Sequence, residues 1–272
     1  MIAFAGNSLL CRLALRHTRI DAASFTFIRI VSGATALWLI MKMRNAEWSC
    51  AGNWPSALAL FAYAAAFSFA YISLSVATGA LLLFGAVQAT MILWGVRKGE
   101  RLRARQFVGL ALAVGGLVVL LFPGLSAPPF SGSILMLGAG VAWGIYSLRG
   151  KAAGDPVCAT SGNFLRAVPL AAVLSVALLS SASLDSAGIG YAILSGAIAS
   201  GVGYAIWYTA LPGLKVASAA TVQLSVPVLA AAGGIIFLSE PITLRFLFAS
   251  VAVLGGIALV VIEKRRAFAP VK

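Results

Sequence analysis

Residues 240–261 read EPITLRFLFASVAVLGGIALVV, and residues 100–121 read ERLRARQFVGLALAVGGLVVLL. The two stretches align 140 positions apart, with an acidic residue, an arginine and a Gly-Gly pair at matching places. The matched residues are Glu100 and Glu240, Arg105 and Arg245, and the pairs Gly115-Gly116 and Gly255-Gly256. A second alignment, 137 positions apart, matches Phe27, Arg29, Val31, Ala34 and Leu37 with Phe164, Arg166, Val168, Ala171 and Leu174. An internal duplication of an apolar chain is typical of membrane proteins built from two repeats with a substrate path between them.

The composition predicts a membrane protein. Of the 272 residues, 61% are hydrophobic and only 10% are charged, whereas a soluble domain carries about 25% charged residues. The sequence contains ten apolar runs of about the length that a helix needs to cross a bilayer. The runs are residues 1–15, 22–41, 54–73, 76–96, 104–122, 132–149, 157–180, 188–210, 216–238 and 243–262. They are too long for the strands of a membrane barrel and lack the alternation of such strands, so we expect an all-α integral membrane protein with about ten transmembrane helices.

The ten runs divide into two sets of five, one in residues 1–122 and one in residues 131–266. Because five is an odd number, the second set enters the membrane from the opposite side, which predicts two inverted five-helix repeats. The Pro- and Gly-containing stretch at 122–131 is the predicted linker. Alignment of Ala5 with Trp143 leaves the first helix about eight residues shorter than its counterpart. We therefore expect either an upstream translation start or a short first helix.

Positive charge lies at the ends of the apolar runs. The formal net charge is +13, and cations at such positions determine membrane topology, so we expect no nucleic-acid partner. If the N-terminus is cytoplasmic, the loops on that side carry fourteen Lys and Arg residues. The outer loops then carry four, which are Arg12, Arg16, Arg19 and Arg245. This bias predicts an inner-membrane protein with both termini in the cytoplasm.

The residues that carry catalytic and metal chemistry are sparse. The three cysteines form no metal-like spacing, the only histidine, His17, falls in a loop, and no phosphate-binding GxxxxGK[ST] motif occurs. All seven acidic residues lie at or near the ends of runs. A buried carboxylate is the usual proton relay of small multidrug transporters, and a hydrolase needs paired carboxylates, so both classes are disfavoured. We predict no enzyme activity, no cofactor and no metal.

Two pairs of charged residues have two interpretations each. Arg29 and Arg166 lie inside their runs at matching positions of the predicted repeats. They either attract an anionic group of a substrate or snorkel to the membrane interface, and we favour snorkelling. Glu100 and Glu240 open the last run of each repeat, where a carboxylate interacts with free N–H groups, and Pro241 suits a first helical turn. We favour this helix-start role over the alternative of a gate contact between the repeats.

Aromatic and amide side chains inside the runs are the candidates for a substrate site. Tyr204, Trp207 and Tyr208 share one helix face through spacings of three and four residues. Stacked Tyr and Trp suit an amphipathic organic substrate, although helix packing explains any single one equally well. An amide such as that of Gln223 is costly in hydrocarbon unless it is wetted or bonds to another helix. The predicted substrate-binding residues are Asn7, Tyr63, Phe67, Gln88, Trp143, Tyr146, Tyr204, Trp207, Tyr208 and Gln223.

One long stretch of the second predicted repeat combines several distinctive features. Residues 203–247 read GYAIWYTALPGLKVASAATVQLSVPVLAAAGGIIFLSEPITLRFL, and in them the chain best resembles the EamA type of the drug/metabolite transporter superfamily. They combine an aromatic-rich span, a short turn, a span with a central proline, and a Gly-rich stretch ending in Glu-Pro. The Ala-Trp-Gly of 142–144 also fits, whereas the tryptophan expected near Ala5 is missing. The resemblance implies ten spans and transport, and bacterial members often export amino acids or other small metabolites.

We hypothesise a secondary transporter that exports a small organic metabolite, such as an amino acid, by alternating access across the inner membrane. Its expected partners are the small-molecule substrate and the lipid bilayer, with a homodimer as a further possibility. Two alternatives stay open. One is a non-transporting membrane sensor or assembly subunit, which should lack a solvated central cavity. The other is a multidrug- or lipid-type efflux protein of the same superfamily.

Overall fold

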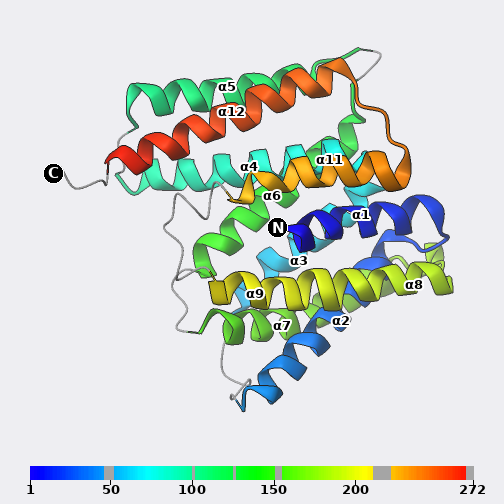
Figure 1. Cartoon of the computed structure of the whole chain (residues 1–272). Helices are drawn as coiled ribbons and strands as arrows, with labels where there is room; N and C mark the ends of the chain where they lie inside the picture. Colours follow the sequence, from blue (N-terminus) through cyan, green and yellow to red (C-terminus); the bar gives the residue numbers. More distant parts are fainter. Residues whose placement is uncertain (46–51, 100–101, 125–126, 151–154, 211–221, 268–272) are drawn as a thin grey trace.

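The computed structural model describes residues 1–45, 52–99, 102–124, 127–150, 155–210 and 222–267, with side chains described as far as residue 261. These residues form helices and connecting turns, with no strand among them. The first predicted repeat holds α1 (Ile2–His17), α2 (Ala22–Met43), α3 (Trp54–Tyr71), α4 (Val76–Arg97) and α5 (Ala104–Leu121). The second holds α6 (Phe130–Gly150), α7 (Pro156–Ala177), η1 (Leu179–Ser181), α8 (Ser186–Ile193), η2 (Leu194–Val202), α9 (Gly203–Ala210), α11 (Ser225–Leu238) and α12 (Leu244–Ala267) (Figure 1).

Eight helical segments in the described part are long and apolar enough to cross a membrane. One of them runs from Ser186 to Ala210 and joins α8, η2 and α9 end to end. The shorter apolar helices α1 and α11 complete the set. The prediction of an all-α membrane protein with about ten helices is confirmed. Residues 216–221 of the predicted ninth run, and Glu100, lie outside the described residues.

Short polar side chains fix where the helices begin. Asp21 caps α2 by accepting hydrogen bonds from the amides of Ala23 and Ser24, and its second oxygen accepts one from the amide of Ser183. Partial burial opposes ionisation of this carboxyl, but the hydrogen bonds to Ser24, Ser183 and Ala23 outweigh burial and lower its pKa. Asp21 therefore ties the start of α2 to the loop that precedes α8.

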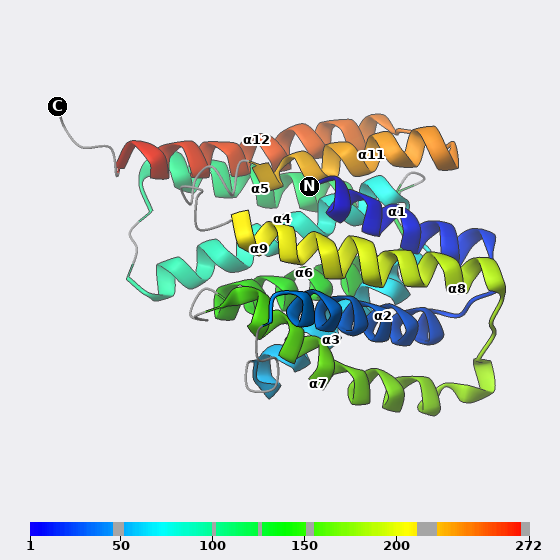
Figure 2. The same cartoon turned by 60° about the horizontal axis from the view of Figure 1, so that its bottom comes forward.

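Two pairs of helices lie at opposite edges of the bundle. Figures 1 and 2 show α5 and α12 side by side at one edge, and α2 and α7 packed together toward the other. Between these pairs lie α1, α3, α4, α6, α9 and α11. At the α5–α12 contact the backbones approach so closely that a Cβ atom on Gly109 would meet the carbonyl oxygen of Gly256 at 2.5 Å. Glycine permits this close approach because it has no side chain to separate the two backbones.

The η2 segment is a π-helix, which the hydropathy pattern did not predict. Its Gly196 packs directly on α2, where an added Cβ would collide with the carbonyl oxygen of Arg29 and the hydroxyl of Ser32. This contact brings Ser195 and Ser200 to the side of η2 that faces α1 and α2. π-Helical segments frequently occur at functional sites.

The loop before α12 differs from the prediction. Helix α12 begins at Leu244, so Glu240 and Pro241 lie in the preceding loop and neither belongs to its first turn. The side chain of Thr243 caps the helix instead, by accepting a hydrogen bond from the amide of Phe246. The carboxylate of Glu240 is therefore available for contacts with other helices.

Candidate functional site

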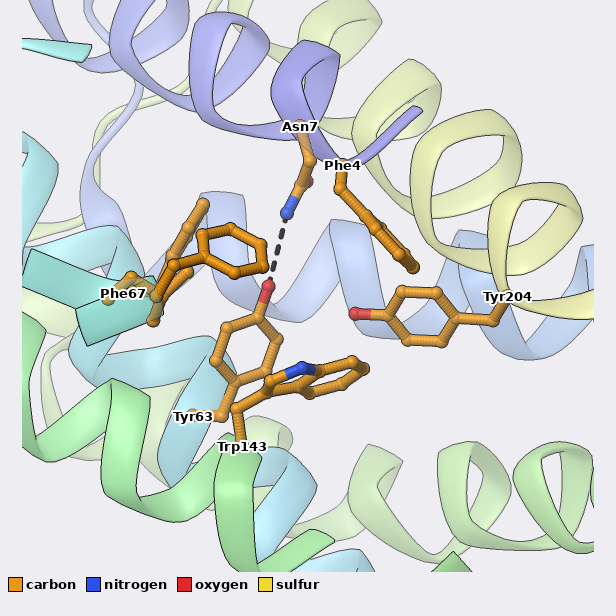
Figure 3. A pocket seen from close by; sticks show the side chains of 8 residues that line it. Phe4, Asn7, Tyr63, Phe67, Trp143 and Tyr204 are labelled. Atoms are coloured by element: carbon orange, nitrogen blue, oxygen red, sulfur yellow. Dashed lines mark hydrogen bonds between the residues drawn. The ribbon is translucent and has the colours of Figure 1, made fainter. Parts of the chain in front are cut away.

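A small cavity lies at the meeting point of α1, α3, α4, α6 and α9. Its volume is about 10 Å³, which leaves room for about one water molecule. The cavity is lined by Phe4, Asn7, Tyr63, Phe67, Leu83, Phe84, Trp143 and Tyr204. Figure 3 shows the rings of Phe4, Tyr63, Trp143 and Tyr204 turned toward one another beneath Asn7. The site is thus small and compact, with aromatic walls.

Trp143 is the centre of the aromatic wall. Its ring centroid lies 4.9 Å from that of Tyr63 and 5.0 Å from that of Tyr204, and it stacks on Tyr146 at 5.3 Å. Phe4 contacts Tyr204 edge-on at 5.6 Å. Aromatic pairs of this kind contribute about 0.5–1.5 kcal/mol each beyond their buried area. They hold planar apolar faces around the cavity, which suits the apolar part of an organic molecule.

The hydroxyl of Tyr63 is the centre of a polar network. Its oxygen accepts a hydrogen bond from Nδ2 of Asn7 at 3.2 Å (Figure 3) and another from Nη2 of Arg29 at 3.0 Å. Asn7 in turn accepts a hydrogen bond from the hydroxyl of Ser195 at 2.6 Å. Because the oxygen of Tyr63 accepts two bonds, its own O–H proton remains to be donated elsewhere. The network joins α1, α2, α3 and η2.

Arg29 does not snorkel, so that interpretation is wrong for this residue. Its side chain is only 2% exposed, and its Nε donates a long hydrogen bond of 3.4 Å to the hydroxyl of Ser200. The guanidinium carbon lies 4.9 Å from the ring centroid of Phe67 and 5.2 Å from that of Tyr63. A cation over an aromatic face gains about 0.5–2 kcal/mol. Two cavity residues therefore hold the charge in the interior of the bundle.

The repeat-matched Arg166 has different surroundings. It is half-buried, and its Nη1 donates to the carbonyl oxygen of Gly162, one turn earlier in α7, at 3.0 Å. Arg166 lies in the middle of α7, and this bond ties its side chain to its own helix. Arg29, by contrast, bonds the cavity residue Tyr63.

The structure brings five of the ten predicted site residues to the cavity, namely Asn7, Tyr63, Phe67, Trp143 and Tyr204. Tyr146 lies behind Trp143, and the half-buried Trp207 contacts Phe4 at 6.1 Å between ring centroids. Tyr208 and Gln88 are buried outside the lining, and Gln223 is half-buried near the start of the described part of its span. Tyr208, Gln88 and Gln223 were predicted to bind substrate, but they do not line the cavity in this conformation.

The sequence prediction missed Phe4, Leu83 and Phe84. Phe4 supplies the aromatic ring for which a tryptophan was expected near Ala5, one position earlier in the chain. It shares a face of α1 with Asn7 through a spacing of three residues, which is the signal that could have identified it. Leu83 and Phe84 stand in the apolar stretch 79–87, between Thr78 and Gln88, where the pattern does not distinguish a cavity residue from a packed one.

A polar contact closes one end of the bundle. Nη1 of Arg12 donates to the carbonyl oxygens of Tyr71 at 2.8 Å and Ile72 at 2.9 Å, at the end of α3. Its Nε lies 3.4 Å from Oε1 of Glu240, whose Oε2 accepts a hydrogen bond from the amide of Val76 at 2.8 Å. We call these five residues the Arg12–Glu240 latch. The latch corrects two predictions, because Arg12 is a buried residue of α1 and Glu240 bridges separate helices.

Contacts also join the helices at the opposite end of the described bundle. The side chain of Arg149 in α6 donates to Ser56 at 3.0 Å and to Asn53 at 3.1 Å, both at the start of α3. Asn163 of α7 accepts a hydrogen bond from the amide of Asn53 at 2.9 Å. Beside the Arg12–Glu240 latch a cleft of about 340 Å³ has both Arg12 and Glu240 in its wall. The central cavity is therefore bracketed by polar contacts at both ends.

The chemistry available at the cavity is recognition rather than bond breaking. Its lining offers an amide, two phenols, an indole and a nearby guanidinium, which donate hydrogen bonds and stack. Among the residues that the structure describes, no group of three or more His, Cys, Asp or Glu side chains is placed to hold a metal ion. The arrangement suits reversible binding of a small amphipathic molecule.

The family model of the EamA-like transporter family matches residues 130–262. An uncharacterized protein of Pseudomonas aeruginosa is 56% identical over 261 residues, which cover 96% of this chain and 91% of that protein. An uncharacterized transporter of Archaeoglobus fulgidus is 31% identical over 195 residues, or 70% of this chain and 69% of its own. The threonine/homoserine exporter RhtA of Escherichia coli is 36% identical over 170 residues, which span just over half of each chain, 58% and 56%.

A solved crystal structure of a protein covers 98% of both chains with a TM-score of 0.65 at 18% sequence identity, which shows a shared fold. The family match falls on the predicted second repeat, and the sequence relatives extend the similarity into the first. Together with the apolar helices and the central cavity, these similarities lead to one conclusion: the chain is a multi-pass membrane transporter that belongs to the EamA-like family of the drug/metabolite transporter superfamily.

Proposed function

We propose that the protein exports a small amphipathic organic metabolite, with an amino acid as the leading class, across the inner membrane by alternating access. The observation that carries the proposal is the cavity in which helices of both predicted repeats combine aromatic faces with a polar network. The similarity to the exporter RhtA supports the direction and the substrate class. Transporters of this architecture bind their substrates near the midplane, between the repeats.

The contacts between α5 and α12 support the inverted-repeat division at 1–122 and 131–266. An added Cβ on Gly109 would approach the carbonyl oxygen of Gly256, and one on Gly116 would approach that of Ala249 at 3.1 Å. Under the 140-residue alignment Gly109 matches Ala249 and Gly256 matches Gly116. The contact between Gly109 and Gly256 in one part of the helix pair is therefore equivalent to the contact between Ala249 and Gly116 in the other. This equivalence is what a two-fold axis in the membrane plane produces.

The small volume of the cavity implies that transport requires rearrangement. A space of about 10 Å³ holds about one water molecule, so an amino acid enters only after the aromatic walls separate. The Arg12–Glu240 latch joins α1, α3 and α4 of the first predicted repeat to the α11–α12 loop of the second. In the proposed cycle, release of this latch opens one side while the contacts around Asn53 hold the other side closed.

Counterflow in proteoliposomes tests the proposal. The purified protein is reconstituted with an internal pool of L-threonine or L-homoserine, and uptake of the labelled amino acid is followed. We expect uptake above that of protein-free liposomes, and a loss of about tenfold or more in Trp143→Ala, which removes the central ring. The matched control is Trp94→Ala, because Trp94 is 47% exposed at the end of α4.

The outcomes separate the alternatives. Counterflow that is unaffected by Trp143→Ala contradicts the location of the site. Movement of cationic drugs or lipids in place of amino acids favours the multidrug- or lipid-type alternative. If a panel of amino acids and other small metabolites shows no movement, and cells that overproduce the protein gain no resistance to excess amino acid, a non-transporting sensor or assembly subunit is favoured.

A further inference from the structure

Arg29 carries a buried positive charge without a counter-charge among the described residues. Its Nη1 atom has no hydrogen-bond partner in the described part of the chain, although the side chain is only 2% exposed. The described carboxylates serve elsewhere: Asp21 and Asp185 cap helices, Glu240 bonds Arg12, and Asp155 caps α7 and lies 3.6 Å from Arg44. Buried charges in proteins are ordinarily paired, and in membrane proteins such residues mark substrate paths.

The charge lies directly behind the cavity wall. Arg29 bonds the hydroxyl of Tyr63 and stacks against the rings of Tyr63 and Phe67, and both of these residues line the cavity. The hydroxyl of Tyr63 also retains its own proton for donation, because its oxygen already accepts bonds from Arg29 and Asn7. Arg29 therefore has an unpartnered donor beside the cavity wall that needs an acceptor, and the hydroxyl of Tyr63 also hydrogen-bonds with that of Tyr204.

We propose that Arg29, with the hydroxyl of Tyr63, binds the carboxylate of the transported molecule. This inference rests on the proposed transport function and names the chemical group that the site selects. A guanidinium presents its N–H groups in a fork that matches a carboxylate. The rings of Trp143, Tyr204 and Phe4 also line the cavity, where they suit an apolar side chain or an ammonium group. An α-amino acid has a carboxylate for Arg29 and both an ammonium group and a side chain for the aromatic rings.

A monoanion fits this site better than a phosphate or a cation. Arg12 is held by the Arg12–Glu240 latch, and Arg166 bonds the carbonyl of Gly162, so Arg29 is the described arginine that contacts the cavity wall. One guanidinium balances one carboxylate, whereas a phosphate dianion is usually bound by several donors and cations. A cationic substrate would be repelled by the same charge. The site therefore discriminates by charge as well as by shape.

Pairs of ligands that differ only at the carboxyl group test the proposal. The wild-type protein in nanodiscs is titrated with L-threonine, L-homoserine and L-phenylalanine, and with the amide of each, and the ligand-induced shift in melting temperature is recorded. We expect at least one acid to bind about tenfold or more tightly than its amide. Arg29→Gln should abolish this preference and weaken binding of the acid by a similar factor, whereas Arg29→Lys should keep part of it. Arg166→Gln is the matched control and should behave as wild type.

Two results would overturn the assignment of Arg29: wild-type protein that binds no acid better than its amide, or Arg29→Gln protein that keeps the preference. The comparison of acid with amide uses wild-type protein, so it decides the question even if Arg29→Gln does not fold. Counterflow is measured in parallel. If the protein transports solutes but binds acids and amides equally well, the proposed role of Arg29 is wrong and the transport proposal is supported. If acids bind preferentially but nothing is moved, the role of Arg29 stands and the transport proposal fails.

Discussion

At the scale of single residues, the hydroxyl of Tyr63 is the most connected group of the cavity. It accepts hydrogen bonds from Asn7 and Arg29, and both donors lose their partner if the hydroxyl is removed. We expect Tyr63→Phe to fold, because the ring and its contact with Trp143 remain, and to lower transport about tenfold. Counterflow measures the effect, and Tyr191→Phe in α8 is the control. Wild-type transport by Tyr63→Phe would show that this network has only a packing role.

Asp21 gives the protein a pH-dependent contribution to stability. Its pKa is lowered in the folded state, so its contribution is present above the ordinary aspartate value of about 3.9 and is lost as the pH falls below it. Asp21→Asn removes the acceptor for the amide of Ser183 and should cost up to about 1 kcal/mol at pH 7. The difference from wild type should shrink steadily as the pH falls below about 3.9 and through the lowered pKa of Asp21.

Thermal unfolding at several pH values measures this effect. Asp185→Asn is the comparison, because Asp185 accepts a bond from Gly188 at the start of its own helix, and an asparagine oxygen can accept the same bond. A constant difference between Asp21→Asn and wild type from pH 7 to pH 3 would contradict the assigned role of the ionised carboxylate.

Single residues also show what the sequence could not predict. Arg29 and Arg166 occupy matching positions, yet one faces the cavity and the other bonds its own helix. The difference depends on how α2 and α7 rotate about their axes and on the close approach of Gly196 to α2. Hydropathy does not encode this rotation, because a lipid-facing side is as apolar as a buried one. Tyr71 shows the same limit: aromatic residues at the ends of spans usually belong to the interfacial belt, but the ring of Tyr71 is fully buried against Phe67.

At the scale of helices, two adjacent glycines of α12 have opposite surroundings. An added Cβ on Gly256 would collide with the carbonyl oxygen of Gly109 and meet the amide of Ala113 at 2.8 Å, whereas one on Gly255 would meet nothing within 4 Å. We expect Gly256→Val to destabilise the protein by about 1–3 kcal/mol through overpacking. Gly255→Val, with the same helix propensity, should be near neutral. Size-exclusion chromatography after graded heating measures both, and equal melting temperatures would contradict the observed helix contact.

One face of α12 is buried against α5. Val253 on this face is fully buried against Gly116. Val251, which is 67% exposed, is the suitable neutral control position on the same helix. The glycines of α5 and α12 permit this close contact of the two helices. The glycine pattern does not specify which side of each helix makes the contact. Hydropathy does not encode the rotation of a helix about its axis, because a lipid-facing side is as apolar as a buried one.

The Arg12–Glu240 latch is the element-scale feature that transport should disturb. Glu240→Gln keeps the size of the side chain but removes the charge that faces Arg12. We expect the cleft beside the latch to open more often. In a cysteine-free background carrying Ala77→Cys, a buried position in the wall of that cleft, labelling by a membrane-impermeant maleimide should accelerate several-fold.

The control for the latch is Arg245→Gln. Arg245 is half-buried and bonds the carbonyl oxygen of Phe122 at the same end of the bundle, outside the latch. Its loss should leave labelling of the introduced cysteine at the wild-type rate. Unchanged labelling in Glu240→Gln would show that the ion pair stabilises the loop without controlling access.

At the scale of the whole molecule, the sequence predicted the class and the helix order well. The run 54–73 corresponds to α3 at Trp54–Tyr71, and the run 104–122 corresponds to α5 at Ala104–Leu121. Length and hydropathy suffice for such assignments because the bilayer requires about 20 apolar residues. The π-helical η2 segment was missed because it has the same hydropathy as its α-helical neighbours. The division into inverted repeats and a possible homodimer remain predictions.

Orientation in the membrane is a prediction of the whole chain. The fourteen-to-four bias of cations places both termini in the cytoplasm. An alkaline phosphatase that requires the periplasm should therefore be inactive when it is fused to the C-terminus, and a cytoplasmic fluorescent reporter should be bright there. Phosphatase activity of the fusion would reverse the assignment and would place the Arg12–Glu240 latch on the cytoplasmic side.

The small volume of the central cavity also matters for the energy balance of a cell. A membrane that stores an electrochemical gradient loses it through any continuous chain of water molecules, because protons hop along such a chain. The described helices leave about 10 Å³ at the centre, space for about one water molecule, between aromatic walls. A cavity of this size has no room for a chain of water molecules of its own. In this conformation the space between the aromatic rings therefore stores no water column along which protons could hop.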